Sequence, residues 1–388
     1  MNYPLTHTNW NKNEISAMQK VIKSGMFTMG KNVLSFEKNF SNYLGKKYSI
    51  MVNSGSSANL LGLSSLFFKK KNPLKRGDEV IVTAVSWSTT YAPLQQLGLK
   101  LKLVDINLDN FNLDENLLEK AISKKTKLIV IVNLLGIPCN LKKIKSLCDK
   151  KKIYFFEDNC ESMGAEVNRK KAGSFGDLSS HSFFFSHHMC TMEGGMISTD
   201  NYELYCLIKS LRAHGWSRDL PKKNPLIKRK KNDFYEEYKF ILPGYNVRPG
   251  ELHGAIGNIQ LKKIEKFINI RRKNLKLFNK LLSKNNKIII PKTKFYSSSF
   301  AFPIIIKKLT KSQKHNLFKK LKRAKIDFRL VTGGCFTKHR YQKYFKYKIY
   351  KNLKNSNYLH DNGFFVGNAS KNLSSGIKSL AKILDKEL

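Results

Sequence analysis

Residues 48–68, YSIMVNSGSSANLLGLSSLFF, place an apolar strand, a turn on Gly55 and a helix in direct succession. The N-terminus of a helix presents unpaired N–H groups and the positive end of the helix dipole. Small residues at such a turn let a ligand approach the backbone closely, and phosphates bind there. The turn is therefore a candidate phosphate site. An ordinary helix cap made of serines explains the same residues equally well.

The alternation of strand and helix continues on both sides of this stretch. We predict helices at residues 11–25 and 141–151, and strands at 78–87, 101–106, 126–136, 153–158 and 196–200. The run TKLIVIVNLLG (126–136) is almost continuously apolar, which is typical of a strand buried on both faces of a parallel sheet. The order of elements predicts an α/β fold with a largely parallel sheet.

The pattern changes after residue 250. A long helix with an apolar stripe is predicted at 251–284, followed by a strand at 299–307 and a helix at 312–326. We expect two domains. Residues 1–250 form an N-terminal segment and a large domain, and residues 251–388 form a small C-terminal α+β domain.

The net charge of +43 raises the hypothesis of a nucleic-acid binder. The lysines, however, are spread along the whole chain, and no nucleic-acid-binding motif accompanies them. We attribute most of the charge to compositional bias and expect no specific nucleic-acid partner. A salt titration against DNA tests this, because nonspecific binding vanishes by physiological salt.

The remaining composition limits the class of protein further. None of the six cysteines forms a CxxC pair, a metal-finger spacing or a four-cysteine iron–sulfur set, so we expect free thiols and no metal. No stretch of 18 apolar residues occurs, and the first residues lack the apolar core of a signal peptide. We therefore expect a cytoplasmic protein with no membrane partner.

Three further motifs follow predicted strands or precede the long helix. Asp158 ends a buried strand, where α/β folds place ligands, and a protonated pyridine nitrogen would balance its charge; an acidic helix cap is the alternative. Trp87 would stack on a flat ring, or else lie in the core. In GYNVRPGE (244–251) turn formation explains Gly and Pro, but not Asn246 and Arg248.

Together, and in this order, these motifs resemble the sugar-nucleotide aminotransferases of the DegT/DnrJ/EryC1/StrS family over nearly the whole chain. The resemblance implies the pyridoxal-phosphate (PLP)-dependent aspartate-aminotransferase fold (type I), with a central, mostly parallel, seven-stranded sheet. It implies that Trp87 stacks on the PLP ring and that Asp158 pairs with its pyridine nitrogen. It also implies a homodimer with shared active sites, whose phosphate-binding residues are Gly55, Ser56, Ser57, Ser182 and, from the neighbouring subunit, Asn246.

The stretch SFFFSHHMCTMEGG (182–195) departs from the family pattern S-F-x-x-x-K-N-x-T-x-G-E-G-G. The family's lysine forms a Schiff base with PLP, and this chain has His187 in that column. Met192 also replaces the glycine that precedes Glu193. A histidine cannot form an imine, which excludes ordinary lysine-assisted transamination. Either the protein is a catalytically inactive relative with a regulatory or scaffold role, or its chemistry has changed.

Changed chemistry is implied by the resemblance to one subgroup, the sugar-nucleotide 3-dehydratases, which carry paired histidines in this column. Four stretches resemble it particularly: FTMG (27–30), VSWSTTYAPLQQLG (85–98), EDNCES (157–162) and HDNGFFVGN (360–368). The lack of an iron–sulfur cysteine set favours its cluster-free enzymes, which act on GDP-4-keto-6-deoxymannose. The resemblance then implies PLP and its amino form PMP as cofactor, L-glutamate as amino donor, and loss of the 3-hydroxyl on a dideoxysugar route. Another nucleotide-4-ketosugar remains the alternative substrate.

His187 is the expected acid/base, because the pKa of imidazole lies near working pH; the alternative is a core histidine. We expect His188 to point elsewhere, and Glu161 to orient the base or a water. His214 and Arg218 are candidates for the donor carboxylate or the sugar, or else form a basic helix end. Arg329 and Lys338 are candidates for the nucleotide phosphates.

Overall fold

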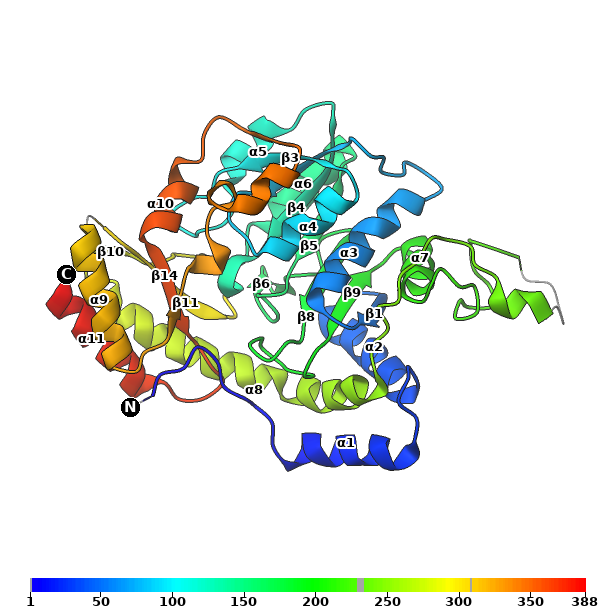
Figure 1. Cartoon of the computed structure of the whole chain (residues 1–388), viewed down its shortest axis with the longest axis horizontal. Coiled ribbons are helices and arrows are strands. Elements are labelled where there is room, and N and C mark those ends of the chain that lie inside the picture. Colours follow the sequence, from blue (N-terminus) through cyan, green and yellow to red (C-terminus); the bar gives the residue numbers. More distant parts are fainter. Residues whose placement is uncertain (1, 229–233, 308) are drawn as a thin grey trace.

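The computed structural model describes residues 2–228, 234–307 and 309–388 (Figure 1). A central sheet has eight strands in the order β1-β9-β8-β5-β4-β2-β3-β13. β9 runs antiparallel to both of its neighbours, and the other described strands of this sheet run parallel to one another, so the sheet is mostly parallel. The strands are β1 (Tyr48–Val52), β9 (Gly195–Thr199), β8 (Leu178–Ser182), β5 (Tyr154–Asp158), β4 (Thr126–Val132), β2 (Glu79–Thr83), β3 (Lys100–Val104) and β13 (Tyr347–Ile349).

The predicted count of seven strands was one too few. The eighth strand, β13, comes from the C-terminal part of the chain and pairs in parallel with β3. Lys348 on β13 and Lys102 on β3 both pair with the buried carboxylate of Glu79, at 2.7 and 2.5 Å. β13 has three partly or fully exposed residues and no apolar run, so its sequence carries no strand signal that could have been recognised.

Both faces of the sheet are buried, as the apolar strands predicted. Along β4, Leu128 and Val130 face one apolar cluster, whereas Ile129 and Ile131 face another. The first face is covered by α3 (Gly55–Ser65), α4 (Ser88–Gln96) and α7 (Tyr202–Arg212), and the second by α5 (Glu115–Ala121) and α6 (Leu141–Lys151). This arrangement confirms the predicted α/β fold, and it shows that helices cover both faces of the sheet.

Residues after the large sheet build a smaller unit with its own core. Its four-stranded antiparallel sheet has the order β10 (Ile288–Ile289), β11 (Ala301–Ile306), β14 (Gly363–Gly367), β12 (Phe328–Arg329). The helices α9 (Lys311–Arg323), α10 (Lys354–Asn362) and α11 (Ser374–Glu387) accompany it. The long helix α8 (Glu251–Leu282) connects it to the rest and packs against α1 (Lys12–Ser24) and α2 (Lys31–Leu44) (Figure 1).

The division at residue 250 stays a proposal, and two segments cross it. Tyr3 lies in the core of the smaller unit, and β13 lies in the large sheet. The helix predicted to end at Gly25 does so: Gly25 adopts a left-handed φ of 67° directly after α1. Among the described helices, none combines the length and the apolar composition needed to cross a lipid bilayer.

Candidate active site

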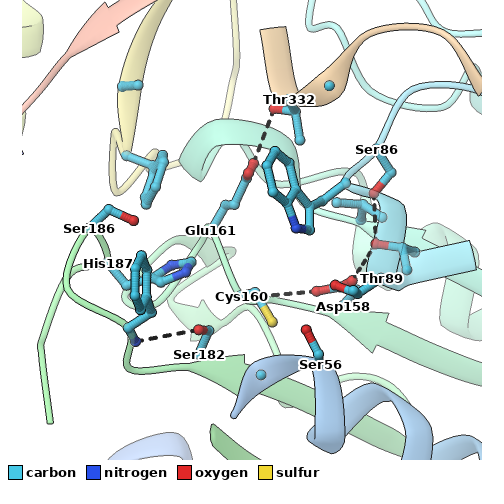
Figure 2. A pocket seen from close by; sticks show the side chains of 18 of the residues that line it. Ser56, Ser86, Thr89, Asp158, Cys160, Glu161, Ser182, Ser186, His187 and Thr332 are labelled. Atoms are coloured by element: carbon cyan, nitrogen blue, oxygen red, sulfur yellow. Dashed lines mark hydrogen bonds between the residues drawn. The ribbon is translucent and has the colours of Figure 1, made fainter. Parts of the chain in front are cut away.

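A cavity of about 690 Å³ opens where the large sheet meets the smaller unit (Figure 2). Its walls come from the carboxyl ends of β4 and β5, the N-terminus of α3, the loop after β8, and residues 300, 301, 329, 330, 332 and 333 of the smaller unit. Ligands of open α/β sheets bind at this kind of place, beyond the carboxyl ends of parallel strands. The fold thus brings to one cavity residues that the sequence predicted from distant motifs.

The N-terminus of α3 faces this cavity with Gly55 and Ser56, and Ser182 lies beside them at the end of β8. A Cβ on Gly55 would lie 2.5 Å from Cβ of Ser182, so only glycine allows this close approach. Ser54 caps the helix by accepting the N–H of Ser57 at 3.1 Å, and its hydroxyl donates to that of Ser57. Ser57 does not line the cavity; it supports the cap. The geometry fits a phosphate at the helix N-terminus.

Asp158 ends β5 and is 4% exposed. Its Oδ2 accepts hydrogen bonds from Nδ2 of Asn59 at 2.9 Å and from Oγ1 of Thr90 at 2.7 Å. The N–H of Cys160 donates to Oδ1 at 3.3 Å. Within the described ranges, no lysine or arginine pairs with this carboxylate. A buried carboxylate aimed at a cavity fits a cationic ligand atom such as a protonated pyridine nitrogen.

Sequence reasoning assigned no role to Asn59 and Thr90. Asn59 lies in the glycine turn motif, and Thr90 lies in the segment that contains Trp87, so the motifs were found but not these contacts. The available signal was a polar residue one turn into each helix that follows a strand. Trp87 is 59% exposed and lines the cavity, so the alternative of a core tryptophan was wrong.

His187 lies in the loop between β8 and β9 and lines the cavity (Figure 2). Its ring packs 5.3 Å from that of Phe300. Its Nδ1 is buried and has no hydrogen-bond partner within the described residues. Burial lowers the pKa of His187 to about 4, helped by the nearby charge of Arg271 and opposed by the backbone of Cys160. The expectation of a pKa near working pH was therefore wrong, because the ring is desolvated; it is neutral at pH 7 and able to accept a proton.

His188 points away from the cavity, as expected. Its ring is fully buried, and Nε2 lies 3.2 Å from the carbonyl of Ser298. Burial lowers its pKa well below the usual value, as does the charge of Arg271. His188 is therefore a neutral packing residue that ties the loop to the smaller unit.

Glu161 also lines the cavity, beside Thr332 (Figure 2). Its Oε2 accepts the N–H of Leu135 at 2.8 Å and the hydroxyl of Thr332 at 3.4 Å. Both partners have left-handed backbones, with φ of 51° and 38°. Burial raises the pKa of Glu161 to about 7, and the charge of Asp158 adds to the shift. Strained residues held around a titratable carboxyl are typical of a functional site.

The substrate candidates fall into two groups. Arg329 lines the cavity from β12. Lys338 lies outside its lining, 3.8 Å from Asp361. His214 and Arg218 also lie outside and both pack on Trp216, at 4.9 and 4.3 Å from its ring. Lys338, His214 and Arg218 therefore do not line the cavity of their own chain.

Asn246 lies outside the cavity as well, where Nε of Arg248 donates to its Oδ1 at 3.1 Å. Ala213 forms a bridge with Asn246, so the GYNVR turn and the His214 segment are neighbours. The expected role of Asn246 in a neighbouring subunit stays a prediction.

A sequence model of the DegT/DnrJ/EryC1/StrS aminotransferase family matches residues 9–370. The chain belongs to this family. A family member from Yersinia pseudotuberculosis, GDP-4-keto-6-deoxy-D-mannose 3-dehydratase, is 48% identical over 388 residues, which cover 100% of this chain and 99% of the relative.

Solved structures of a dehydratase of the same name superimpose closely. One is a histidine-to-asparagine variant with bound GDP-perosamine, and another holds a trapped PLP-glutamate geminal diamine. Each has a TM-score of 0.96 and 47% identity, and covers 99% of this chain and 100% of its own. As a family member, this chain has the PLP-dependent aminotransferase fold that its motifs implied.

Proposed function

We propose that this chain is a PLP-dependent sugar-nucleotide 3-dehydratase that removes the C3 hydroxyl of GDP-4-keto-6-deoxymannose, with L-glutamate as amino donor. One observation carries the proposal. The cavity is lined by the N-terminus of α3, by Trp87 and by the buried Asp158, and also by His187, which replaces the lysine of the family's sequence pattern. No lysine is found among the described residues that line the cavity. Retention of the binding residues argues against an inactive scaffold.

The binding roles that the family resemblance implies are compatible with the geometry of the cavity. The N-terminus of α3, with Gly55, Ser56 and Ser182, would hold the cofactor phosphate, and Trp87 would stack on the ring. Asp158 would keep the proton on the pyridine nitrogen, since its Oδ2 is fixed by Asn59 and Thr90. When bound, the cofactor in its PMP form supplies an amine for the C4 ketone of the sugar and an electron sink for loss of the neighbouring hydroxyl.

His187 would move the proton. Its imidazole is neutral at working pH and is the only histidine among the described residues that line the cavity. It would accept a proton from the carbon that joins the cofactor to the amine, and return it to the departing C3 hydroxide. Glu161, with a pKa of about 7, would orient the base or a water. Because no lysine lines the described part of the cavity to complete transamination, hydrolysis would release the nitrogen at C4 of the sugar as ammonia.

We propose a homodimer in the cytoplasm, without specific nucleic-acid or membrane partners. Five large apolar side chains of α1, α2 and the turn between them are more than two-fifths exposed: Ile15, Ile22, Met26, Phe27 and Leu34. Such a surface is typical of an interface. Asn246 lies outside its own chain's cavity, which supports a role at the phosphate of the neighbouring subunit.

The relatives support the substrates. The structures with GDP-perosamine and with the PLP-glutamate adduct belong to a 3-dehydratase that aligns over nearly the whole chain. A decisive experiment is incubation with PLP, glutamate and GDP-4-keto-6-deoxymannose, followed by mass spectrometry of the sugar nucleotide. We expect loss of one oxygen, with one 2-oxoglutarate and one ammonia formed.

Other outcomes of that incubation contradict parts of the proposal. An amino sugar would show that His187 does not prevent transamination, and the mechanism would be wrong. No reaction with the GDP sugar, but oxygen loss from a CDP, dTDP or UDP ketosugar, would keep the dehydratase and replace its substrate. No reaction with any of them would favour the regulatory or scaffold role.

A further inference from the structure

The segment that precedes α1, residues 3–10, crosses from the smaller unit to the large one and is called the strap here (Figure 1). Its start is fixed by Tyr3, which is 1% exposed. The N–H of Tyr3 donates to the carbonyl of Lys325 at 2.8 Å, and the N–H of Asp327 donates to the carbonyl of Tyr3 at 2.9 Å. The phenol donates to the carbonyl of Gly367 at 2.9 Å. The strap is therefore anchored in the core of the smaller unit.

The middle of the strap forms part of the wall of the active-site cavity. Leu5 and Thr6 line this cavity together with His187. The hydroxyl of Thr6 donates to the carbonyl of Phe185 at 3.4 Å. The strap thus contacts the histidine loop, defined here as residues 183–191, two residues before His187.

The end of the strap, Trp10, contacts the last part of the histidine loop. Nε1 of Trp10 donates to the carbonyl of Cys190 at 3.0 Å. The N–H of Cys190 donates to Oε1 of Gln260 at 3.2 Å, and Gln260 in turn donates to the buried carboxylate of Glu14 at 2.8 Å. Both backbone groups of Cys190 are therefore held from outside the loop, by the strap and by α8.

Inside the loop, fewer contacts restrain the catalytic side chain. Two backbone bonds close it, from His187 to Phe184 and from Thr191 to Phe183, both at 2.9 Å. The ring of His187 packs on Phe300 and interacts with the backbone of Cys160, and its Nδ1 has no partner among the described residues. Its position therefore depends on where the backbone of the loop is held, and small misplacements of a catalytic group cost much of the rate.

We infer that the strap is a working part of the active site, in which Trp10 is a positioning residue that holds His187 through Cys190 while Leu5 and Thr6 close the cavity wall. The inference rests on the proposed function for the role of His187. It concerns residues that touch the loop from outside, and none of them takes part in proton transfer.

The test is Trp10→Phe, which keeps an aromatic ring and removes one N–H. We expect hydrogen–deuterium exchange of residues 184–190 in the PLP-loaded protein to become roughly fivefold faster, as for loss of one hydrogen bond. We expect kcat to fall at least as much, with unchanged KM for the sugar and unchanged absorbance of bound PLP. In a His187→Asn background, Trp10→Phe should cause no further loss of kcat.

The matched control for exchange is Trp216→Phe, since Nε1 of Trp216 is buried without a hydrogen-bond partner in the described part of the chain. It should leave exchange of residues 184–190 unchanged. Thr6→Val is the second variant, for the case in which Trp10→Phe does not fold, and should speed exchange in the same residues.

The outcomes separate this inference from the proposed function. Unchanged exchange in both strap variants overturns the inference, whether or not the sugar nucleotide turns over. Faster exchange with unchanged kcat, in a protein whose wild type is active, overturns the positioning role and leaves the dehydratase standing. An inactive wild type overturns the proposed function, and the exchange rates still decide whether the strap holds the loop.

Discussion

At the scale of single residues, His187 carries the proposed proton transfer. We expect His187→Asn to lower sugar turnover by at least about 100-fold, because asparagine cannot accept a proton at neutral pH. Bound PLP should remain, since His187 is not among the proposed phosphate or ring contacts. Initial rates of 2-oxoglutarate formation and the absorbance of bound PLP measure the two effects. The control is His315→Asn on α9, which is exposed and should change neither; a variant at position 187 with wild-type turnover contradicts the role.

The substitution His187→Lys tests whether position 187 corresponds to the lysine that binds PLP in the family. A lysine in this column should attach PLP covalently and abolish dehydration, because the family's reaction depends on that amine. The absorbance spectrum with added PLP should therefore shift relative to the wild type. A spectrum identical to that of the wild type would contradict the assignment of position 187 to the place of the family's lysine.

Glu161 gives a prediction for stability against pH. Its pKa is raised from the ordinary 4.5 to about 7 in the folded protein, so the fold binds this proton more tightly than the unfolded chain does. Its contribution favours the fold below about pH 4.5 and is lost as the pH rises through about 7. Glu161→Gln should therefore gain stability relative to the wild type from pH 4.5 to 7.5, by up to ~3 kcal/mol.

Urea unfolding of both proteins at several pH values measures this difference. The other titrating groups are common to both chains and cancel in the comparison. Parallel curves for the wild type and Glu161→Gln across this window would show that the carboxyl titrates normally in the fold.

At the scale of elements, the close contact between α3 and β8 depends on the absence of a Cβ atom at Gly55. Gly55→Ala would place a Cβ 2.5 Å from Cβ of Ser182 and push the helix N-terminus away from the strand end. We expect the affinity for PLP to fall at least about tenfold, because the phosphate loses its aligned N–H groups. Fluorescence titration with PLP measures it.

Gly45→Ala is the control for that substitution. Gly45 follows α2 with a φ of 74°, and a Cβ there would meet nothing within 4 Å. The change should cost about 1 kcal/mol of stability through backbone strain and leave PLP affinity unchanged. Equal losses of PLP affinity in both variants would show that general destabilisation, not the phosphate turn, is responsible.

The helices and strands also show which parts of the fold could be predicted from the sequence. The strand β4 was predicted because a strand buried on both faces of a parallel sheet is apolar almost throughout. The helix at 11–25 was predicted because its apolar stripe ends at a glycine that can adopt a left-handed backbone. By contrast, β13 is short and half-exposed, so only its pairing with β3 makes it a strand.

The candidate site was predicted unevenly for a similar reason. Residues at strand ends and helix starts, such as Asp158 and Gly55, stand in local patterns that the sequence displays. Asn59 and Thr90 act through contacts with Asp158 that span 99 and 68 residues. The depressed pKa of His187 comes from burial, which depends on packing by distant segments. Such contacts follow from the tertiary fold and cannot be recognised from the spacing of residues along the sequence.

At the scale of the whole molecule, the shared active sites of the proposed dimer can be tested by mixing variants. His187→Asn and Asn246→Asp should each be inactive alone, the second because a new negative charge would repel the phosphate. In a mixed dimer, one site would combine the intact His187 of one subunit with the intact Asn246 of the other. Co-refolding both variants should restore about a quarter of wild-type turnover, as expected for random two-fold pairing. Mixtures as inactive as their parents would contradict the shared sites.

The anchoring of Tyr3 also has a consequence for the order in which contacts can form during translation. The ring of Tyr3 packs over Gly376, and its hydroxyl bonds to Gly367, which is separated from it by 364 residues. At a synthesis rate of about 5 to 20 residues per second, Tyr3 waits roughly 20 to 70 s after its own synthesis for Gly367. Residues 3–10 are thus translated long before the segment that anchors them, and the active-site wall that they complete closes only after Gly367 has been synthesised.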